Sequence, residues 1–147
     1  MDVSFEYLPK ADVEGWVHSL HSTRPSMALG VLLAGDRCEC ITETVVAKIN
    51  NTIVGIATIA PEGEQLSGEP TIVALYVLPE YRQKGIGFQL LEAAIDHMIK
   101  KGIAPIRIDV LHSKVLKMVN RLPTEKRQKL NVVDQSMGGV LDSVLDT

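Results

Sequence analysis

Residues 75–91, LYVLPEYRQKGIGFQLL, carry more information about this chain than any other segment. The segment starts with apolar residues, and Pro79 stops them as a proline stops a strand. A basic loop with two glycines follows, and an apolar periodicity typical of a helix begins inside that loop. The sequence therefore predicts a strand, a glycine-containing turn and a helix in immediate succession.

The turn between this strand and this helix is suited to an anion. The N–H groups of a first helical turn have no partner within the helix, and the helix dipole favours negative charge there. Gly85 and Gly87 have no Cβ to hold a diphosphate away from the backbone, while Arg82 and Lys84 add positive charge. The Gly-Lys-Ser/Thr of a Walker loop is absent, and Leu90 stands where a dinucleotide fingerprint has its third glycine. Glycines that only form a turn are the alternative.

The pattern from Val77 to Gly87 closely resembles the acetyl-CoA-binding motif of the GNAT N-acetyltransferase superfamily. In that family, Arg/Gln-x-x-Gly-x-Gly/Ala binds the pyrophosphate of coenzyme A through backbone amides, and residues 82–87 match it without a mismatch. The resemblance implies that acetyl-CoA is the co-substrate and that its contacts include Leu75, Val77, Arg82, Gln83, Lys84, Gly85, Ile86, Gly87 and Phe88. Backbone groups of Leu75 and Val77 would hydrogen-bond to the pantetheine arm.

The flanking segments fit the same order of elements. Residues 3–8 predict a short strand, and residues 12–20 have one apolar stripe of a helix. The pair Asn50-Asn51 lies between two β-rich segments and predicts a hairpin, and residues 106–111 predict a strand after the long helix. The resemblance implies an α/β (α+β) fold with a mixed, mostly antiparallel sheet flanked by helices. Its fourth and fifth strands would run parallel and splay apart at a bulge.

Length and composition fit one domain. The chain has 147 residues, of which 46% are hydrophobic, and no linker divides it. We therefore expect residues 1–147 to form a single acetyltransferase-like domain, with residues 135–147 as a candidate flexible tail.

Charge and apolar patterning exclude other classes. A net charge of −3 argues against binding nucleic acid through an overall basic field. No apolar run is long enough to span a bilayer, and the N-terminus does not have the pattern of a signal peptide. Cys38 and Cys40 fit two reduced thiols better than a disulfide or zinc framework. We expect a cytoplasmic protein without a metal, a nucleic-acid partner or a membrane partner, as a monomer or homodimer.

The C-terminal third departs from the family pattern. Many members follow the fifth strand with Asn-x-x-Ala and later have a tyrosine that protonates the leaving thiolate, whereas residues 111–114 read LHSK and no tyrosine follows. The frequent Gly-Phe before a sixth strand is also missing. His112 and Ser113 are the catalytic candidates, because they follow the strand that would line the acyl site and histidine exchanges protons near neutral pH. The alternatives are a helix N-cap for Ser113 and a surface loop for His112.

The expected function is transfer of an acetyl group from acetyl-CoA to an amine of a small molecule or peptide. Glu62, Glu64 and Glu69 offer a base or an attraction for a cationic acceptor, with a solvated acidic loop as the alternative. Residues 113–130 hold six basic residues and one acid, which suggests a contact with the coenzyme's 3′-phosphate or else a solvated helical face. There are two competing functions. One is a non-catalytic acyl-CoA-binding module of the same fold, and the other is an interaction domain with an incidental glycine turn.

Overall fold

The computed structural model describes residues 2–23, 41–62 and 68–145. Cys38, Cys40 and Glu64 lie outside the described residues. The strands are β1 (Val3–Pro9), β2 (Glu43–Ile49), β3 (Thr52–Ala60), β4 (Thr71–Val77), β5 (Ile106–Val110) and β6 (Leu130–Asp134). The helices are α1 (Glu14–Thr23), α3 (Ile86–Lys100), α4 (Ser113–Arg121), α5 (Thr124–Arg127) and α6 (Asp142–Leu145), with short 3-10 turns η1 (Lys10–Asp12) and η2 (Pro79–Tyr81).

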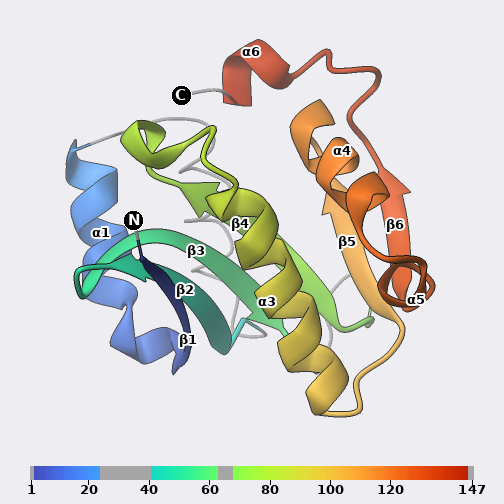
Figure 1. Ribbon diagram of the computed structural model, residues 1–147, viewed down its shortest axis with the longest axis horizontal. Helices are drawn as coiled ribbons and strands as arrows, with labels where there is room; N and C mark the ends of the chain where they lie inside the picture. The colour runs from blue at the N-terminus through green and yellow to red at the C-terminus, as the bar shows by residue number, and fades with distance from the viewer. Residues whose placement is uncertain (1, 24–40, 63–67, 146–147) are drawn as a thin grey trace.

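The described strands form one sheet in which neighbours in the sequence are neighbours in space (Figure 1). The pairs from β1 to β4 are antiparallel, whereas β5 is parallel to both β4 and β6. Adjacent residues of β2 point to opposite faces: Val45 packs in the cluster that includes α3, and Val46 packs in the cluster that includes α1. The expected mixed, mostly antiparallel sheet flanked by helices is confirmed.

Helix α3 packs its apolar face against one side of the sheet. Its buried side chains recur at helical spacing and are fully inaccessible at Leu90, Leu91, Ala94, Ile95 and Met98. The helix ends where Gly102 adopts a φ of 74°, a left-handed conformation that a glycine reaches without a steric cost. The chain enters α1 through the 3-10 turn η1, so that helix begins two residues later than residue 12.

The hairpin between β2 and β3 has the predicted turn. Asn50 and Asn51 have φ values of 50° and 65°, as the two central residues of a tight hairpin require. In β3, Gly55 lies close to the next strand, since a Cβ there would be 3.2 Å from the carbonyl oxygen of Tyr76. A glycine at this position therefore lets β3 and β4 approach each other.

The strands β4 and β5 separate immediately after they meet. They pair only at Thr71 with Arg107 and at Ile72 with Ile108. The next residue of β4, Val73, is the extra residue of a bulge, because β3 pairs with Ile72 and then with Ala74. Figure 1 shows the two strands diverging from this point. The splay at a bulge is confirmed, and it opens the space in which the candidate site lies.

The C-terminal part contains a strand that the sequence did not predict. After the short helix α5, β6 pairs with β5 along its length as an edge strand. Beyond it the chain returns toward α4: Ser136 is buried, and Asp142 accepts hydrogen bonds from Ser113. The mobility expected for residues 135–147 stays a prediction. Within the described residues, none of the helices has both the length and the apolar character that crossing a membrane requires.

Candidate functional site

A pocket of about 590 Å³ lies between the diverging ends of β4 and β5. Helix α4 and the loop that leads into α3 form its other walls. Eight of the eleven residues proposed from the sequence line it: Leu75, Val77, Arg82, Gln83, Gly85, Gly87, Phe88 and His112. The other three, Lys84, Ile86 and Ser113, are not among its lining residues.

Gly85 gives the pocket an accessible backbone at the start of α3. It is the residue before the helix, with φ of 79° and ψ of 1°, and no side chain caps the helix there. A Cβ on Gly85 would have no atom within 4 Å, so this side of the loop is open. Ile86 turns its side chain into the core, where it is 2% exposed. Any contact that Ile86 makes with a ligand in the pocket is therefore restricted to its backbone.

Gly87 has a different environment from Gly85. A Cβ on Gly87 would lie 3.1 Å from Cε of Met118, so α4 packs directly on the first turn of α3. The contacting atom is the end of a flexible thioether side chain, which changes rotamer readily. A side chain added at Gly87 would have to displace this methyl group.

Arg82 holds the end of β4 and the start of the loop together. Its Nε donates a hydrogen bond of 2.9 Å to the carbonyl oxygen of Val77. Its guanidinium carbon lies 5.2 Å from the centre of the Tyr76 ring, which is buried on the α1 side of the sheet. This positive charge is thus fixed at the edge of the pocket by a hydrogen bond and a cation–π contact.

The end of β5 continues into α4 through His112 and Ser113. His112, not Ser113, is the N-cap: its Nδ1 accepts a hydrogen bond of 3.0 Å from the backbone N–H of Lys114. Ser113 is the first helical residue, and both its N–H and its hydroxyl donate to the carboxylate of Asp142. The N-cap interpretation of Ser113 is therefore wrong by one residue. The imidazole of His112 caps the helix, and the Ser113 hydroxyl donates to Asp142.

Asp142 therefore ties helix α6 to the start of α4. The hydrogen bonds from the Ser113 hydroxyl and amide hold the pKa of Asp142 below its usual value, and the nearby His112 and Lys114 lower it further. Asp142 Oδ1 is also 3.5 Å from His112 Nδ1. Because Nδ1 accepts from the Lys114 amide, a neutral His112 carries its proton on Nε2. Sequence patterns gave no signal for Asp142, which lies 29 residues from Ser113.

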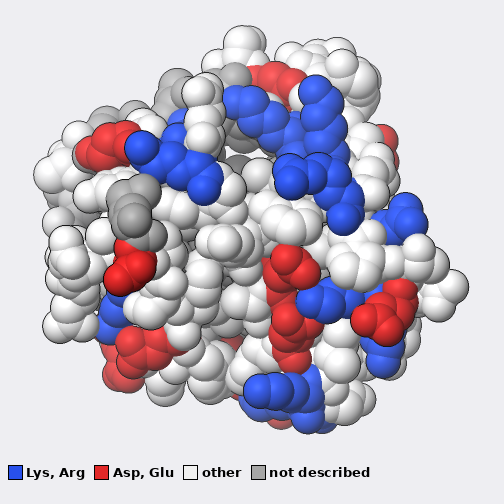
Figure 2. All heavy atoms as spheres, in the orientation of Figure 1, with Lys and Arg blue, Asp and Glu red and all other residues white. Residues whose placement is uncertain are grey.

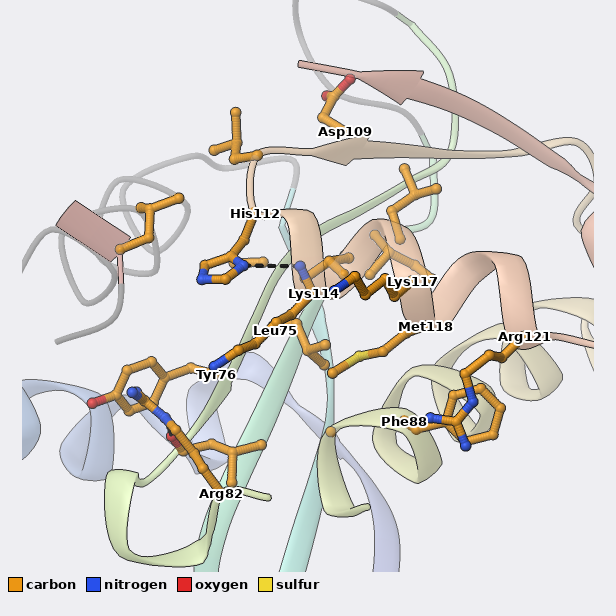
Figure 3. A pocket seen from close by; sticks show the side chains of 18 of the residues that line it. Leu75, Tyr76, Arg82, Phe88, Asp109, His112, Lys114, Lys117, Met118 and Arg121 are labelled. Atoms are coloured by element: carbon orange, nitrogen blue, oxygen red, sulfur yellow. Dashed lines mark hydrogen bonds between the residues drawn. The ribbon is translucent and has the colours of Figure 1, made fainter. Parts of the chain in front are cut away.

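Helix α4 presents basic side chains to the pocket. Lys114, Lys117 and Arg121 all line it, and their spacing of three and four residues places them on one face of the helix. The Arg121 guanidinium carbon is 4.7 Å from the centre of the Phe88 ring (Figure 3). Figure 2 shows Lys and Arg side chains on both sides of a hollow in this region of the surface. The helical spacing of the three residues was the signal in the sequence that could have identified this face.

The carboxylates near the pocket already have partners. Arg107 lies 3.0 Å from Oδ1 of the lining residue Asp109 and 3.0 Å from Oε2 of Glu69. Hydrogen bonds from Arg107 and Asn131 hold the pKa of Glu69 below its usual value. Glu69 thus links the loop before β4 to β5 and β6. In the described part of the chain, no group of three or more His, Cys, Asp or Glu side chains is arranged to hold a metal ion.

A second group of titratable side chains lies at the other end of α3, against β1 and β2. The buried Glu43 accepts hydrogen bonds from Tyr7 and Lys101, and its Oε2 is 3.9 Å from Nε2 of His97. Burial opposes ionisation of Glu43, but the bonds from Lys101 and Tyr7 outweigh it and lower its pKa. Burial lowers the pKa of His97, and the charge of Glu43 offsets only part of this effect. This group stabilises the fold away from the pocket.

Comparisons with known proteins identify structural relatives of the chain and its family. A search of curated proteins finds no match. Among solved structures, a ribosomal-protein-alanine N-acetyltransferase from Brucella melitensis is 19% identical with a TM-score of 0.54, covering 87% of each chain. The GNAT N-acetyltransferase YhbS from Escherichia coli, solved with CoA, is 20% identical with a TM-score of 0.57, covering 79% of this chain and 67% of its own.

An aminoglycoside acetyltransferase from a soil metagenomic sample is 18% identical with a TM-score of 0.55, covering 80% of this chain and 85% of its own. At these identities the likeness shows the fold alone. The sequence profile of the acetyltransferase (GNAT) family matches residues 13–118, which is most of the chain and contains β2 to β5 and the glycine turn. The protein is therefore a member of the GNAT acetyltransferase family.

Proposed function

We propose that this protein transfers the acetyl group of acetyl-CoA to the amine of a small molecule or peptide. The observation that carries the proposal is the pocket in the β4–β5 splay, which has the open backbone of Gly85 at one wall. Its volume of about 590 Å³ is in the range of small-molecule and cofactor sites. The solved relative YhbS binds CoA, which supports the same donor here.

The coenzyme would be held mainly by backbone groups. The backbone N–H groups of the first turn of α3 have no acceptor within the helix and no side chain caps them, and a diphosphate is favoured there by these groups and by the helix dipole. The pantetheine arm would lie along the free edge of β4 at Leu75 and Val77, because the strand leaves β5 beyond Ile72. These contacts would put the thioester near the end of β5, where His112 lines the pocket.

The reaction would proceed by direct attack. The amine nitrogen bonds to the thioester carbonyl carbon, the C–S bond breaks, the departing thiolate takes up a proton and the new amide nitrogen loses one. The main contribution of the protein is positioning, for which effective molarities are worth about 7–11 kcal/mol. His112 is the proposed proton donor to the sulfur, because it lines the pocket and imidazole side chains are common general acids and bases in enzymes. Ser113 would act only by fixing the turn, since its hydroxyl donates to Asp142.

The acceptor would have an amine that is neutral at moderate pH. Deprotonating an amine at pH 7 costs about 1 kcal/mol for an α-amine and about 4–5 kcal/mol for a lysine side chain. The lining carboxylate Asp109 is held by Arg107, so it does not offer a ready base for a strongly basic amine. A terminal or small-molecule amine of low pKa is therefore the preferred acceptor.

The test is release of free CoA thiol from acetyl-CoA in the presence of a panel of amines, with the acetylated product detected by mass spectrometry. We expect turnover with at least one α-amine, and a loss of kcat of about 100-fold or more in His112→Gln, as general acid–base catalysis contributes about 10²–10⁴. Tight binding of acetyl-CoA without turnover of any amine would contradict the proposal and favour the non-catalytic module. Unchanged kcat in His112→Gln would remove His112 from the mechanism.

A further inference from the structure

The basic face of α4, formed by Lys114, Lys117 and Arg121, brings three cationic side chains to one wall of the pocket. Within the described residues, no carboxylate forms an ion pair with Lys117 or Arg121, although other basic residues nearby are paired. Lys126, for example, lies within 3.0 Å of both Glu92 and Asp96. Two exposed cations that line a pocket without a described counter-ion indicate a ligand with negative charge at this wall.

Arg121 is held in place for such a ligand. Its guanidinium lies over the ring of Phe88, in the first turn of α3, with 4.7 Å between the guanidinium carbon and the ring centre. Stacking on an aromatic ring leaves the edge of the guanidinium available for hydrogen bonds, and its planar fork matches two oxygens of a phosphate. Figure 3 shows this pair on the other side of Met118 from His112. Arg121 thus lies away from the proposed position of the thioester.

We infer that Arg121, assisted by Lys117, binds the 3′-phosphate of coenzyme A and makes the protein select CoA over 3′-dephospho-CoA. This inference rests on the proposed function. CoA carries a diphosphate and a separate phosphate monoester on its ribose. The open amides at Gly85 suit the diphosphate, whereas the monoester, with about −1.5 to −2 charge at pH 7, is the group that side-chain cations bind best.

The experiment compares two ligands that differ only in that phosphate. Isothermal titration measures the Kd of CoA and of 3′-dephospho-CoA for the wild type, Arg121→Ala and Lys117→Ala. Lys100→Ala is the control, because Lys100 is an exposed cation in the last turn of α3 and does not line the pocket. Thermal unfolding of each variant checks that the fold is retained, as expected for exposed side chains.

We expect the wild type to bind CoA at least about 10-fold more tightly than dephospho-CoA, as one or two hydrogen bonds to a charged phosphate would give. Arg121→Ala should raise the Kd of CoA by about that factor and leave the Kd of dephospho-CoA within about 2-fold of the wild-type value. Lys100→Ala should keep the full preference for CoA. Equal losses for the two ligands in Arg121→Ala would overturn the inference and assign Arg121 to the diphosphate. Equal Kd values in the wild type would also overturn it, and binding of neither ligand would overturn the proposed function itself.

Discussion

Replacing Gly85 by alanine separates the turn's conformation from its contact with a ligand. Gly85 has φ of 79°, and an L-residue in the left-handed region costs roughly 1–2 kcal/mol. The added Cβ meets no atom within 4 Å, so no steric clash adds to this cost. For a domain of 147 residues, each kcal/mol corresponds to about 2–4 °C in Tm, and we expect Gly85→Ala to lower Tm by about 2–8 °C.

The same substitution at Gly102 is a matched control at the opposite end of α3. Gly102 has φ of 74°, and a Cβ there also meets no atom within 4 Å. Gly102→Ala should therefore lower Tm by the same amount as Gly85→Ala. It should leave CoA binding unchanged, because Gly102 does not line the pocket.

The two variants should differ only in their affinity for CoA. A Cβ on Gly85 keeps a phosphate away from the backbone amides, and one charge-assisted hydrogen bond is worth about 1.5–3 kcal/mol, or about 10- to 100-fold in Kd. The assays are thermal unfolding and titration with CoA, at a temperature where both variants are folded. If Gly85→Ala lost stability like the control yet bound CoA as tightly as the wild type, the argument from the open backbone would be refuted.

Two further substitutions test the parts of the structure around the pocket and away from it. Asp142→Ala removes the acceptor of two hydrogen bonds from Ser113, and we expect a lower stability and a lower kcat. Asp142→Asn should recover most of that stability in urea unfolding, and equal losses in both variants would contradict the hydrogen-bonding role. Burial lowers the pKa of His97. As the pH falls below about 6.5, the unfolded state therefore binds more protons than the folded state. The stability that is present above this pH is then lost on acidification. His97→Phe, which keeps a ring stacked on Tyr7, should flatten the fall in Tm between pH 7 and pH 5, and an unchanged slope would show that another group causes it.

The parts of the fold that were predicted from the sequence have local causes. The Asn50-Asn51 turn and the glycine turn at Gly85 follow from the residues that occupy them, since few others adopt positive φ readily. The burial of α3 follows from its apolar spacing. The family motif then predicted the splay of β4 and β5, which no periodicity indicates by itself.

The parts that were not predicted depend on contacts between distant residues. β6 is a short edge strand in which Leu130 and Val133 are only half-buried, so it lacks the long apolar run of an inner strand such as β3. The cap of α4 was assigned to Ser113 because serine is a favoured N-cap residue, but Asp142 takes the Ser113 hydrogen bonds from the far end of the chain. In the sequence, the basic face of α4 is evident only as an excess of Lys and Arg in residues 113–130. The position of α4 in the fold brings three of these residues to one wall of the pocket.

The most direct test of the proposed donor site is a titration of the protein with CoA, with Gly87→Glu alongside the wild type. A glutamate at Gly87 adds bulk against Met118 and a negative charge at the start of α3, where the diphosphate would bind. We predict saturable one-to-one binding by the wild type and no measurable binding by a folded Gly87→Glu variant. Absence of binding to the wild type, or the same affinity in both proteins, would contradict the assignment of this pocket to acetyl-CoA.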